Sequence, residues 1–260
     1  MKKYTKILLS ILCVIFLGVF VFSGYKLYSI IHEYRADQKL YSGLSGEFVT
    51  QNSGDQAPSQ SNSPDSQEPR EVSPISVDFD ALMSQSQYVV GWLYCADTVI
   101  NYPVAQAEDN FYFLERYIDG RYNGCGSLFI DCTCYGDFSG RNTVIYGHHM
   151  NDGSMFASIC KYGKQEYYDA HPVMYLNTPT QNYRVDIFTG FITSADSSVY
   201  TFEFSGDDEY GAFLKKMKGF SDFDCDVEVG VEDRIITLST CTYEYDNARY
   251  VVMGKLVPID

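Results

Sequence analysis

The chain divides into three stretches that differ in their pattern of hydrophobic and polar positions. Residues 7–25 are apolar and uncharged, and three lysines precede them. Residues 42–76 are rich in Ser, Gln, Asn, Pro and Gly and have almost no large apolar side chain. From residue 77 onward, short apolar runs are separated by polar segments. This pattern predicts an apolar N-terminal segment, a polar connector and a folded domain over residues 77–260.

The apolar segment has the length of a membrane anchor. At about 1.5 Å per residue, residues 7–25 form a helix that nearly spans the hydrocarbon core of a bilayer. A cleaved signal peptide is the alternative, with residues 21–23 as its cleavage site, but the run is long for one and no Ala-x-Ala follows. We expect an uncleaved anchor, with residues 1–6 in the cytoplasm and residues 26–41 as a juxtamembrane segment.

The connector has too few apolar residues to form a core. Such a segment cannot bury enough surface to offset the entropy lost on ordering. We therefore predict that residues 42–76 are a disordered tether that separates the domain from the membrane.

The folded part is predicted to be mainly β. Runs rich in β-branched and aromatic residues predict strands at 88–94, 99–104, 127–131, 143–147, 173–176, 183–192, 234–241 and 248–252. Helical patterns are shorter, at 81–83, 109–114, 154–162 and 209–220, and Asp78 or Asp80 is a candidate cap for the first. Many short strands with few helices favour a closed or nearly closed β-barrel with added helices.

Strand ends carry the candidate chemistry. Cys241 ends one predicted strand, and Arg249 begins the next strand, eight residues later. If these strands are neighbours, a thiol nucleophile lies beside a cation that can stabilise an oxyanion. A surface ion pair of Arg249 with Glu244 or Asp246 is the structural alternative.

Two of the four histidines end another strand. His148 and His149 are adjacent, so on an extended chain they point to opposite faces and are unsuited to share one metal ion. The preceding Gly147 favours His148 as the residue close to a substrate, with His149 facing solvent or packing. We expect His171, which precedes a proline, to be a structural turn residue.

Charge narrows the classes of partner. Residues 1–40 have six Lys and Arg against two acidic residues, which is +4, and the remainder has 13 against 32, which is −19. An acidic body disfavours nucleic acid, because binding to phosphates requires cations. It is compatible with partners that carry free amines.

The other cysteines give no metal signature. No Cys-x2-Cys pair occurs, and Cys132 and Cys134 are one residue too close for zinc. We expect no metal and no cofactor. A disulfide among Cys125, Cys132, Cys134 and Cys160 stays open, although burial as small apolar residues is favoured for all cysteines except Cys241.

Three motifs together resemble the class B sortases. They are Leu-Ser-Thr-Cys ending at Cys241, the arginine at position 249 in Ala-Arg-Tyr-Val-Val, and Tyr-Gly-His ending at His148 with Met155-Phe156 downstream. These sortases are membrane-anchored cysteine transpeptidases of Gram-positive bacteria. The resemblance covers residues 77–258 and the anchor-then-tether layout, and the helix before the cysteine strand is also similar.

The resemblance implies a sortase-type barrel of about eight strands, with N-terminal helices, and a definite reaction. Cys241 would cleave a C-terminal sorting signal after Thr and form a thioacyl enzyme. An amine, from a peptidoglycan precursor or a pilin lysine, would then take the acyl group. His148 would transfer protons and Arg249 would stabilise the oxyanion, while Ser239, Thr240 and Tyr200 would contact the signal peptide.

The implied partners are secreted proteins with such signals, the acceptor amine and the membrane. The implied location is the cell membrane, with one span and an extracellular catalytic domain. Rival interpretations are a Cys/His peptidase, an L,D-transpeptidase, whose usual Ser-His-Gly-Cys context is absent here, and a tethered binding domain without catalysis.

Overall fold

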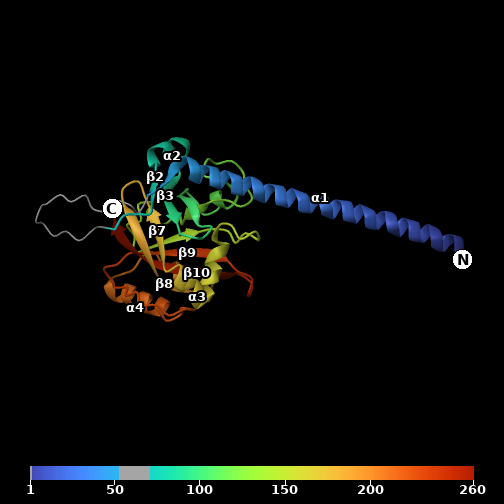
Figure 1. Cartoon of the computed structure of the whole chain (residues 1–260). Helices are drawn as coiled ribbons and strands as arrows, with labels where there is room; N and C mark the ends of the chain where they lie inside the picture. The colour runs from blue at the N-terminus through green and yellow to red at the C-terminus, as the bar shows by residue number, and fades with distance from the viewer. Residues whose placement is uncertain (1, 53–70) are drawn as a thin grey trace, which may run out of the picture. The chain divides into compact units, whose positions relative to one another are not determined.

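The computed structural model describes residues 2–52 and 71–260 (Figure 1). These residues fall into two compact units, one ending at Ser42 and the other running from Gly43 to Asp260. Each unit is described by itself.

The first unit is helical. Helix α1 spans Lys2–Phe48 without a break, so the predicted anchor and juxtamembrane segments lie in one continuous helix. Apolar side chains such as Leu8, Phe16 and Phe22 are exposed on it. Among the described residues, α1 is the one helix long and apolar enough to cross a membrane.

The second unit begins earlier than the sequence predicts. The end of α1 is followed by strand β1 (Val49–Gln51), which pairs antiparallel with β2 (Ile75–Val77). Phe48 and Ile75 are buried in a cluster around Trp92. Residues 42–52 and 71–76 are therefore not a tether. The few apolar residues in this mostly polar stretch, such as Phe48 and Ile75, are enough to fix both ends of it to the unit. The rest of the predicted tether, residues 53–70, lies outside the described residues.

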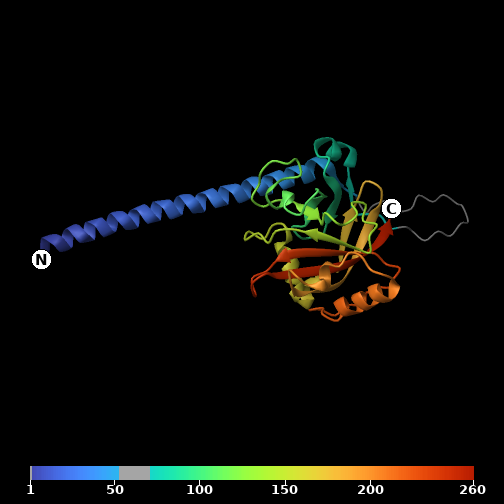
Figure 2. The same ribbon diagram turned by 180° about the vertical axis from the view of Figure 1, so that it is seen from behind.

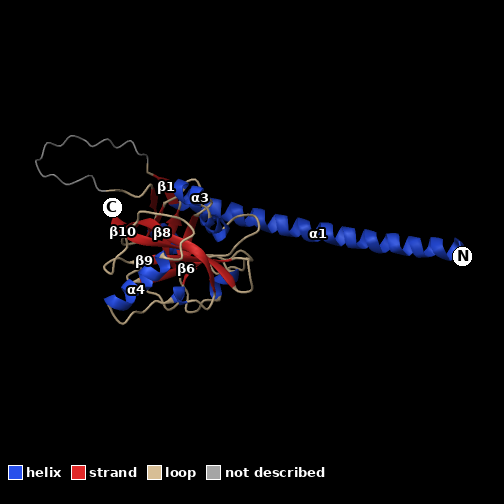
Figure 3. Ribbon diagram, turned by 90° about the horizontal axis from the view of Figure 1, so that it is seen from below, coloured by secondary structure: helices blue, strands red, loops and turns tan. Residues whose placement is uncertain are grey.

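A closed barrel of eight strands forms the body of this unit (Figure 3), as predicted. The order around the barrel is β10-β8-β7-β3-β4-β5-β6-β9. The strands are β3 (Val89–Tyr94), β4 (Asn101–Ala105), β5 (Leu128–Ile130), β6 (Asn142–Tyr146), β7 (Val173–Asn177), β8 (Asn182–Ser194), β9 (Ile235–Cys241) and β10 (Ala248–Ile259). The pairs β4–β5 and β6–β9 are parallel, and the others are antiparallel.

Helices cover the barrel at opposite sides, as the positions of α2 and α4 show (Figures 1 and 2). Helix α2 (Phe79–Gln85) is capped by Asp78, whose carboxylate accepts a hydrogen bond from the Ala81 N–H. Helix α4 (Asp207–Lys218) buries Tyr210, Phe213, Leu214 and Met217 against the barrel, which is the apolar face that the sequence predicts. Its acidic first turn and basic last turn complement the helix dipole.

Shorter helical turns complete the unit. They are the 3₁₀ turns η1 (Tyr112–Glu115), η2 (Phe156–Gly163) and η3 (Ser198–Tyr200), and helix α3 (Gln165–Ala170). The pattern at 154–162 predicted a short helix, which the chain forms as η2. Helix α3 was not predicted, because six residues are too few to show a helical repeat.

Candidate active site

Strand pairing places Cys241 opposite Arg249. The two residues are partners in the antiparallel register of β9 and β10, which are joined by a loop over residues 242–247. Directly opposite residues on antiparallel strands project to the same face, with Cβ atoms about 5 Å apart. The thiol and the guanidinium therefore lie side by side at one end of the barrel.

The parallel pairing of β6 with β9 brings His148 to the same level. Tyr146 is the register partner of Ser239, and the Gly147 N–H donates to the Ser239 carbonyl at 3.1 Å. His148, two residues after Tyr146, is thus level with Cys241. The Thr240 hydroxyl donates to the Gly147 carbonyl at 2.7 Å and ties the two strand ends together.

The packing around residue 147, between β6 and His148, leaves room only for a glycine. A Cβ there would lie 2.5 Å from Leu128 Cδ2 and 2.6 Å from Phe156 Cδ2. Any larger residue would have to displace packed side chains, so the close approach of the strand to the site depends on glycine.

One pocket of about 230 Å³ joins these residues. Cys241, His148 and Arg249 all line it, and so do Ser239 and Thr240. Tyr200 does not line the pocket, but its hydroxyl lies 2.9 Å from the Ser239 hydroxyl. The remaining lining residues are Asn110, Leu114, Phe129, Tyr146 and Gly147.

The His148 ring is held through its Nε2 atom. This nitrogen lies 2.7 Å from the carbonyl oxygen of Leu114, which belongs to η1. Because a carbonyl oxygen can only accept, Nε2 carries the proton of this bond, and Nδ1 of the neutral ring is free to accept one. The ring is thus in a defined tautomer for proton transfer.

His149 lies on the other side of the strand end. Its Nδ1 is 2.8 Å from the Cys241 carbonyl oxygen and 3.5 Å from the Cys160 thiol, and its ring meets Tyr243 edge-on. It therefore contacts the backbone of Cys241 and does not line the pocket. His171 is the C-cap of α3, and its ring lies 4.6 Å from the Tyr167 ring at an interplanar angle of 54°.

Arg249 has no acidic partner among the described residues, where no carboxylate lies within ion-pair distance of its guanidinium. Its Nη1 donates to the Ala248 carbonyl at 3.0 Å. Glu244 instead accepts a hydrogen bond from the Thr242 hydroxyl. The alternative of a surface ion pair for Arg249 thus finds no support, and the cation remains available to the pocket.

Tyr200 is protonated at neutral pH. Burial raises its pKa, and the hydrogen bond to Ser239 and the positive charge of Arg249 only partly counteract this effect. Its hydroxyl can therefore donate as well as accept beside the pocket.

The other cysteines differ in their environment. None of the eight forms a disulfide, so none of the disulfides left open by the sequence is present. Burial raises the pKa of Cys95 and Cys134 to about 11 and that of Cys160 to about 12. These three are thiols at neutral pH and poor nucleophiles, because the thiolate is the reactive form.

Sequence reasoning missed part of the pocket wall. Asn110 and Leu114 come from the turn around η1, and Phe129 comes from β5, so all three are distant in sequence from the motifs. Tyr146 could have been found, because it begins the Tyr-Gly-His motif.

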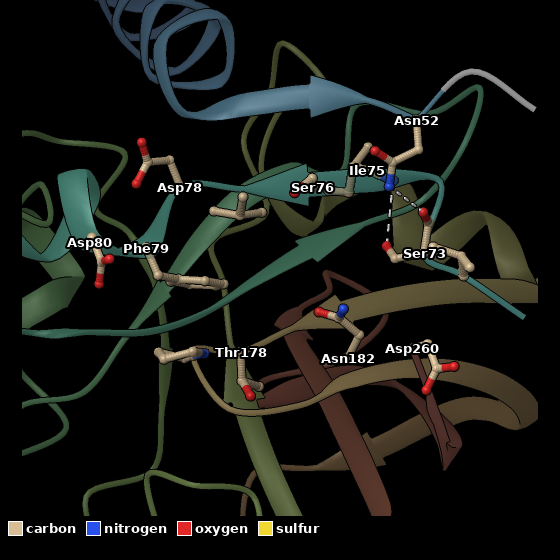
Figure 4. Close-up of a pocket in the computed structure, with 13 residues that line it drawn as sticks. Asn52, Ser73, Ile75, Ser76, Asp78, Phe79, Asp80, Thr178, Asn182 and Asp260 are labelled. Atoms are coloured by element: carbon tan, nitrogen blue, oxygen red, sulfur yellow. Dashed lines mark hydrogen bonds between the residues drawn. The ribbon is translucent and has the colours of Figure 1, made fainter. Parts of the chain in front are cut away.

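A second pocket, of about 430 Å³, lies near β1, β2 and the start of α2 (Figure 4). It is polar, with Asn52, Asp78, Asp80, Asn182 and Asp260 among its lining residues, and it contains no cysteine or histidine. Within residues 2–52 and 71–260, no three His, Cys, Asp or Glu side chains are grouped so as to hold a metal ion.

A thiol, an imidazole and a guanidinium around one pocket at a barrel end are the groups that a cysteine-dependent acyl transfer requires. Comparison with known proteins agrees. The family model described as "Sortase domain" matches residues 98–257. Sortase B of Listeria monocytogenes is 35% identical over 248 residues, which cover 95% of each chain. Sortase B of Staphylococcus aureus is 32% identical over 183 residues, which cover 70% of this chain and 75% of the relative.

Solved structures give the same answer. The S. aureus sortase B-substrate complex superimposes with a TM-score of 0.67 at 32% identity and covers 70% of this chain and 85% of the other. Sortase B from B. anthracis in complex with AAEK1 gives a TM-score of 0.72 at 32% identity, covering 88% and 99%. The chain belongs to the sortase family, and within it to the class B sortases. It is a cysteine transpeptidase, and the rival interpretations are not favoured.

Proposed function

We propose that Cys241, His148 and Arg249 carry the transpeptidation, with Cys241 as the nucleophile. The observation that supports this most directly is that all three line one pocket, although they come from the ends of three strands. The guanidinium of Arg249, which has no acidic partner among the described residues, fits the stabilisation of an oxyanion. The oriented ring of His148 fits the transfer of protons.

The first half-reaction forms a thioester. With the thiol proton of Cys241 transferred to Nδ1 of His148, the thiolate attacks the backbone carbonyl carbon of the Thr in a sorting signal, and the carbonyl oxygen becomes an oxyanion beside Arg249. His148 gives a proton to the leaving nitrogen, the C–N bond breaks, and the C-terminal tail departs as an amine. The remaining protein is bound to Cys241 through its new C-terminal carbonyl.

The second half-reaction transfers the acyl group. An amine attacks the thioester carbon, and His148 removes the proton that the nitrogen must lose. The C–S bond then breaks, which releases the thiolate and leaves a new amide bond. The imidazole thus acts once as an acid and once as a base.

Ser239, Thr240 and Tyr200 are proposed to contact the sorting signal. Ser239 and Thr240 line the pocket on the strand that ends in Cys241, and Tyr200 is hydrogen-bonded to Ser239. These hydroxyl groups can pair with the backbone of an extended peptide.

The acceptor is proposed to be an amine of a peptidoglycan precursor outside the cell. The net charge of −19 beyond residue 40 favours the approach of a cationic amine. Helix α1 is proposed to anchor the chain in the cell membrane with a single span, which keeps the catalytic unit on the extracellular side.

Peptide turnover tests the proposal. The full chain in detergent micelles is incubated with Asn-Pro-x-Thr and Leu-Pro-x-Thr peptides, with and without triglycine, and the products are identified by mass spectrometry. We expect cleavage after Thr and a triglycine adduct. Cleavage elsewhere, or products that never contain the amine, would contradict the transfer step. A lysine peptide that replaces triglycine efficiently would favour a pilin acceptor.

A further inference from the structure

A buried carboxylate lies behind the pocket wall. Asp131 directly follows β5 and is only 4% exposed. Among the residues that the structure describes, no cation pairs with it. A buried charge without a cation is costly unless donors surround it, so its hydrogen bonds show what it is used for.

The two carboxylate oxygens of Asp131 serve different groups. Oδ1 accepts from the backbone N–H and the hydroxyl of Thr133, at 2.9 and 2.7 Å, and so closes a local turn. Oδ2 accepts from the Asn110 amide at 2.8 Å and from the Tyr146 hydroxyl at 2.9 Å. Asn110 and Tyr146 both line the pocket of Cys241. One oxygen therefore supports the loop, and the other supports the site.

Asn110 is fixed at both ends of its side chain. Its Nδ2 donates to Asp131, and its Oδ1 accepts from the Cys132 N–H at 2.8 Å. Asn110 thereby ties the segment that leads into η1 to the loop after β5. The Leu114 carbonyl of η1 in turn holds the His148 ring at 2.7 Å.

We infer that Asp131 is a positioning residue of the transpeptidase: its Oδ2 orients Asn110 and Tyr146 and, through Asn110 and η1, holds the carbonyl that orients His148. Asp131 does not touch the reacting atoms. The inference rests on the proposed role of His148. It extends that role to a residue that no motif in the sequence identifies.

The environment of Tyr146 agrees with this geometry. Burial raises the pKa of Tyr146, and the charge and hydrogen bond of Asp131 raise it further, so its hydroxyl remains a donor to the carboxylate. The Tyr146 ring lies between Phe129 and Tyr200, with centroid distances of 5.4 and 6.1 Å. Its orientation thus affects Phe129, which lines the pocket, and Tyr200, which is hydrogen-bonded to the lining residue Ser239.

The substitution Asp131→Asn separates the two uses of the carboxylate. An asparagine keeps an oxygen for the turn at Thr133, since Asn and Asp form the same local turn. The amide nitrogen then replaces Oδ2 and sets two donors, its own NH2 and that of Asn110, against each other. The matched control is Asp137→Asn, an exposed aspartate in the same loop whose carboxylate accepts from the Ser139 N–H at 3.0 Å.

The test uses the full chain in micelles, with kcat and KM measured on a cleaved sorting-signal peptide and the ring ¹⁵N signals of His148 recorded by NMR. We expect D131N to lower kcat/KM by about 10²-fold, mostly in kcat, as a displaced catalytic group does. The His148 signals should move in D131N and stay in place in D137N.

Two outcomes overturn the inference. One is that D131N turns over like D137N, and the other is that D131N loses activity while the His148 signals do not move. If D131N fails to fold, Asn110→Ala takes its place, because it cuts the same link and leaves the turn intact; unmoved His148 signals in N110A then overturn the inference. Cys241→Ala distinguishes the two levels: turnover by C241A refutes the proposed function itself, whereas an inactive C241A beside a fully active D131N refutes only the role of Asp131.

Discussion

Individual side chains in this protein take their reactivity from burial and from position at strand ends. Cys241 is partly exposed and lines the pocket, whereas Cys95 and Cys134 are buried and Cys160 does not line the pocket; burial raises the pKa values of these three other thiols. A thiol with a pKa of about 11 is in the thiolate form to about one part in a thousand at pH 8, and the fraction grows only as pH rises toward the pKa.

This difference predicts selective alkylation. At pH 8, iodoacetamide should modify Cys241 while leaving Cys95, Cys134 and Cys160 unmodified in the folded chain. Peptide mapping by mass spectrometry measures each site, and the denatured chain serves as the control in which all of them react. Modification of Cys160 as fast as Cys241 would show that burial does not suppress its thiolate.

The two adjacent histidines should differ in their effect on turnover. His148→Ala removes the proposed acid and base, so kcat should fall by about 10²- to 10⁴-fold. His149→Ala removes a hydrogen bond to the Cys241 carbonyl, worth a loss of about fivefold. Steady-state kinetics on a sorting-signal peptide compares the two variants. A larger fall in kcat for His149→Ala than for His148→Ala would mean that His149 is the acid and base.

Much of the site could be predicted from the sequence at the residue scale. Cys241 and His148 lie at the ends of strand-like runs and Arg249 begins the next one, and neighbouring strand ends of one barrel converge, so their shared pocket was foreseeable. Asn110 and Asp131 were not foreseeable, because their partners come from turns whose course no local pattern encodes.

At the scale of elements, the chain at the end of β6 packs closely against the side chains of Leu128 and Phe156. This packing determines where His148 lies. A methyl group at residue 147 would sit 2.5 Å from Leu128 Cδ2. Relief of this overlap requires the strand end to move, which displaces the following histidine.

Gly147→Ala should therefore reduce both stability and activity. We expect a loss of about 1–3 kcal/mol in the free energy of unfolding, typical of overpacking, together with a fall in kcat. Denaturant unfolding and peptide kinetics measure the two effects. Gly206→Ala is the control, because a Cβ there meets no atom within 4 Å. If the two variants had the same stability and the same kcat, the close packing at residue 147 would not be what positions His148.

The elements also show where sequence patterns reach their limit. Helix α4 was predictable because Tyr210, Phe213, Leu214 and Met217 repeat at helical spacing over about two turns. Strands β1 and β2 have three residues each and lie at the two ends of a polar stretch. The composition of the whole stretch is polar, so it gave no sign of these two short strands. Their pairing depends on the distant core around Trp92, which is tertiary information.

At the scale of the whole molecule, an apolar helix and an acidic catalytic unit belong to one chain. Exposed apolar side chains along α1 are stable only if lipid or protein covers them. We propose that lipid does so and, as proposed above, that the catalytic unit lies on the extracellular side of the cell membrane.

Membrane topology can be tested in intact protoplasts of a Gram-positive host. The full chain should remain in the membrane fraction after a carbonate wash, and external protease should degrade the catalytic unit. A cytoplasmic protein serves as the control for intact protoplasts. A catalytic unit that stays protected until the protoplasts are lysed would contradict the extracellular location.

Acyl transfer through a thioester at Cys241 can be observed by mass spectrometry of the trapped intermediate. The full chain is mixed with an excess of a cleaved sorting-signal peptide, quenched in acid and digested. We expect the peptide containing Cys241 to gain the mass of the acyl fragment ending in Thr. Triglycine should remove this mass, and Cys241→Ala should show neither adduct nor turnover. Turnover by Cys241→Ala, or an adduct on another residue that triglycine discharges, would contradict it.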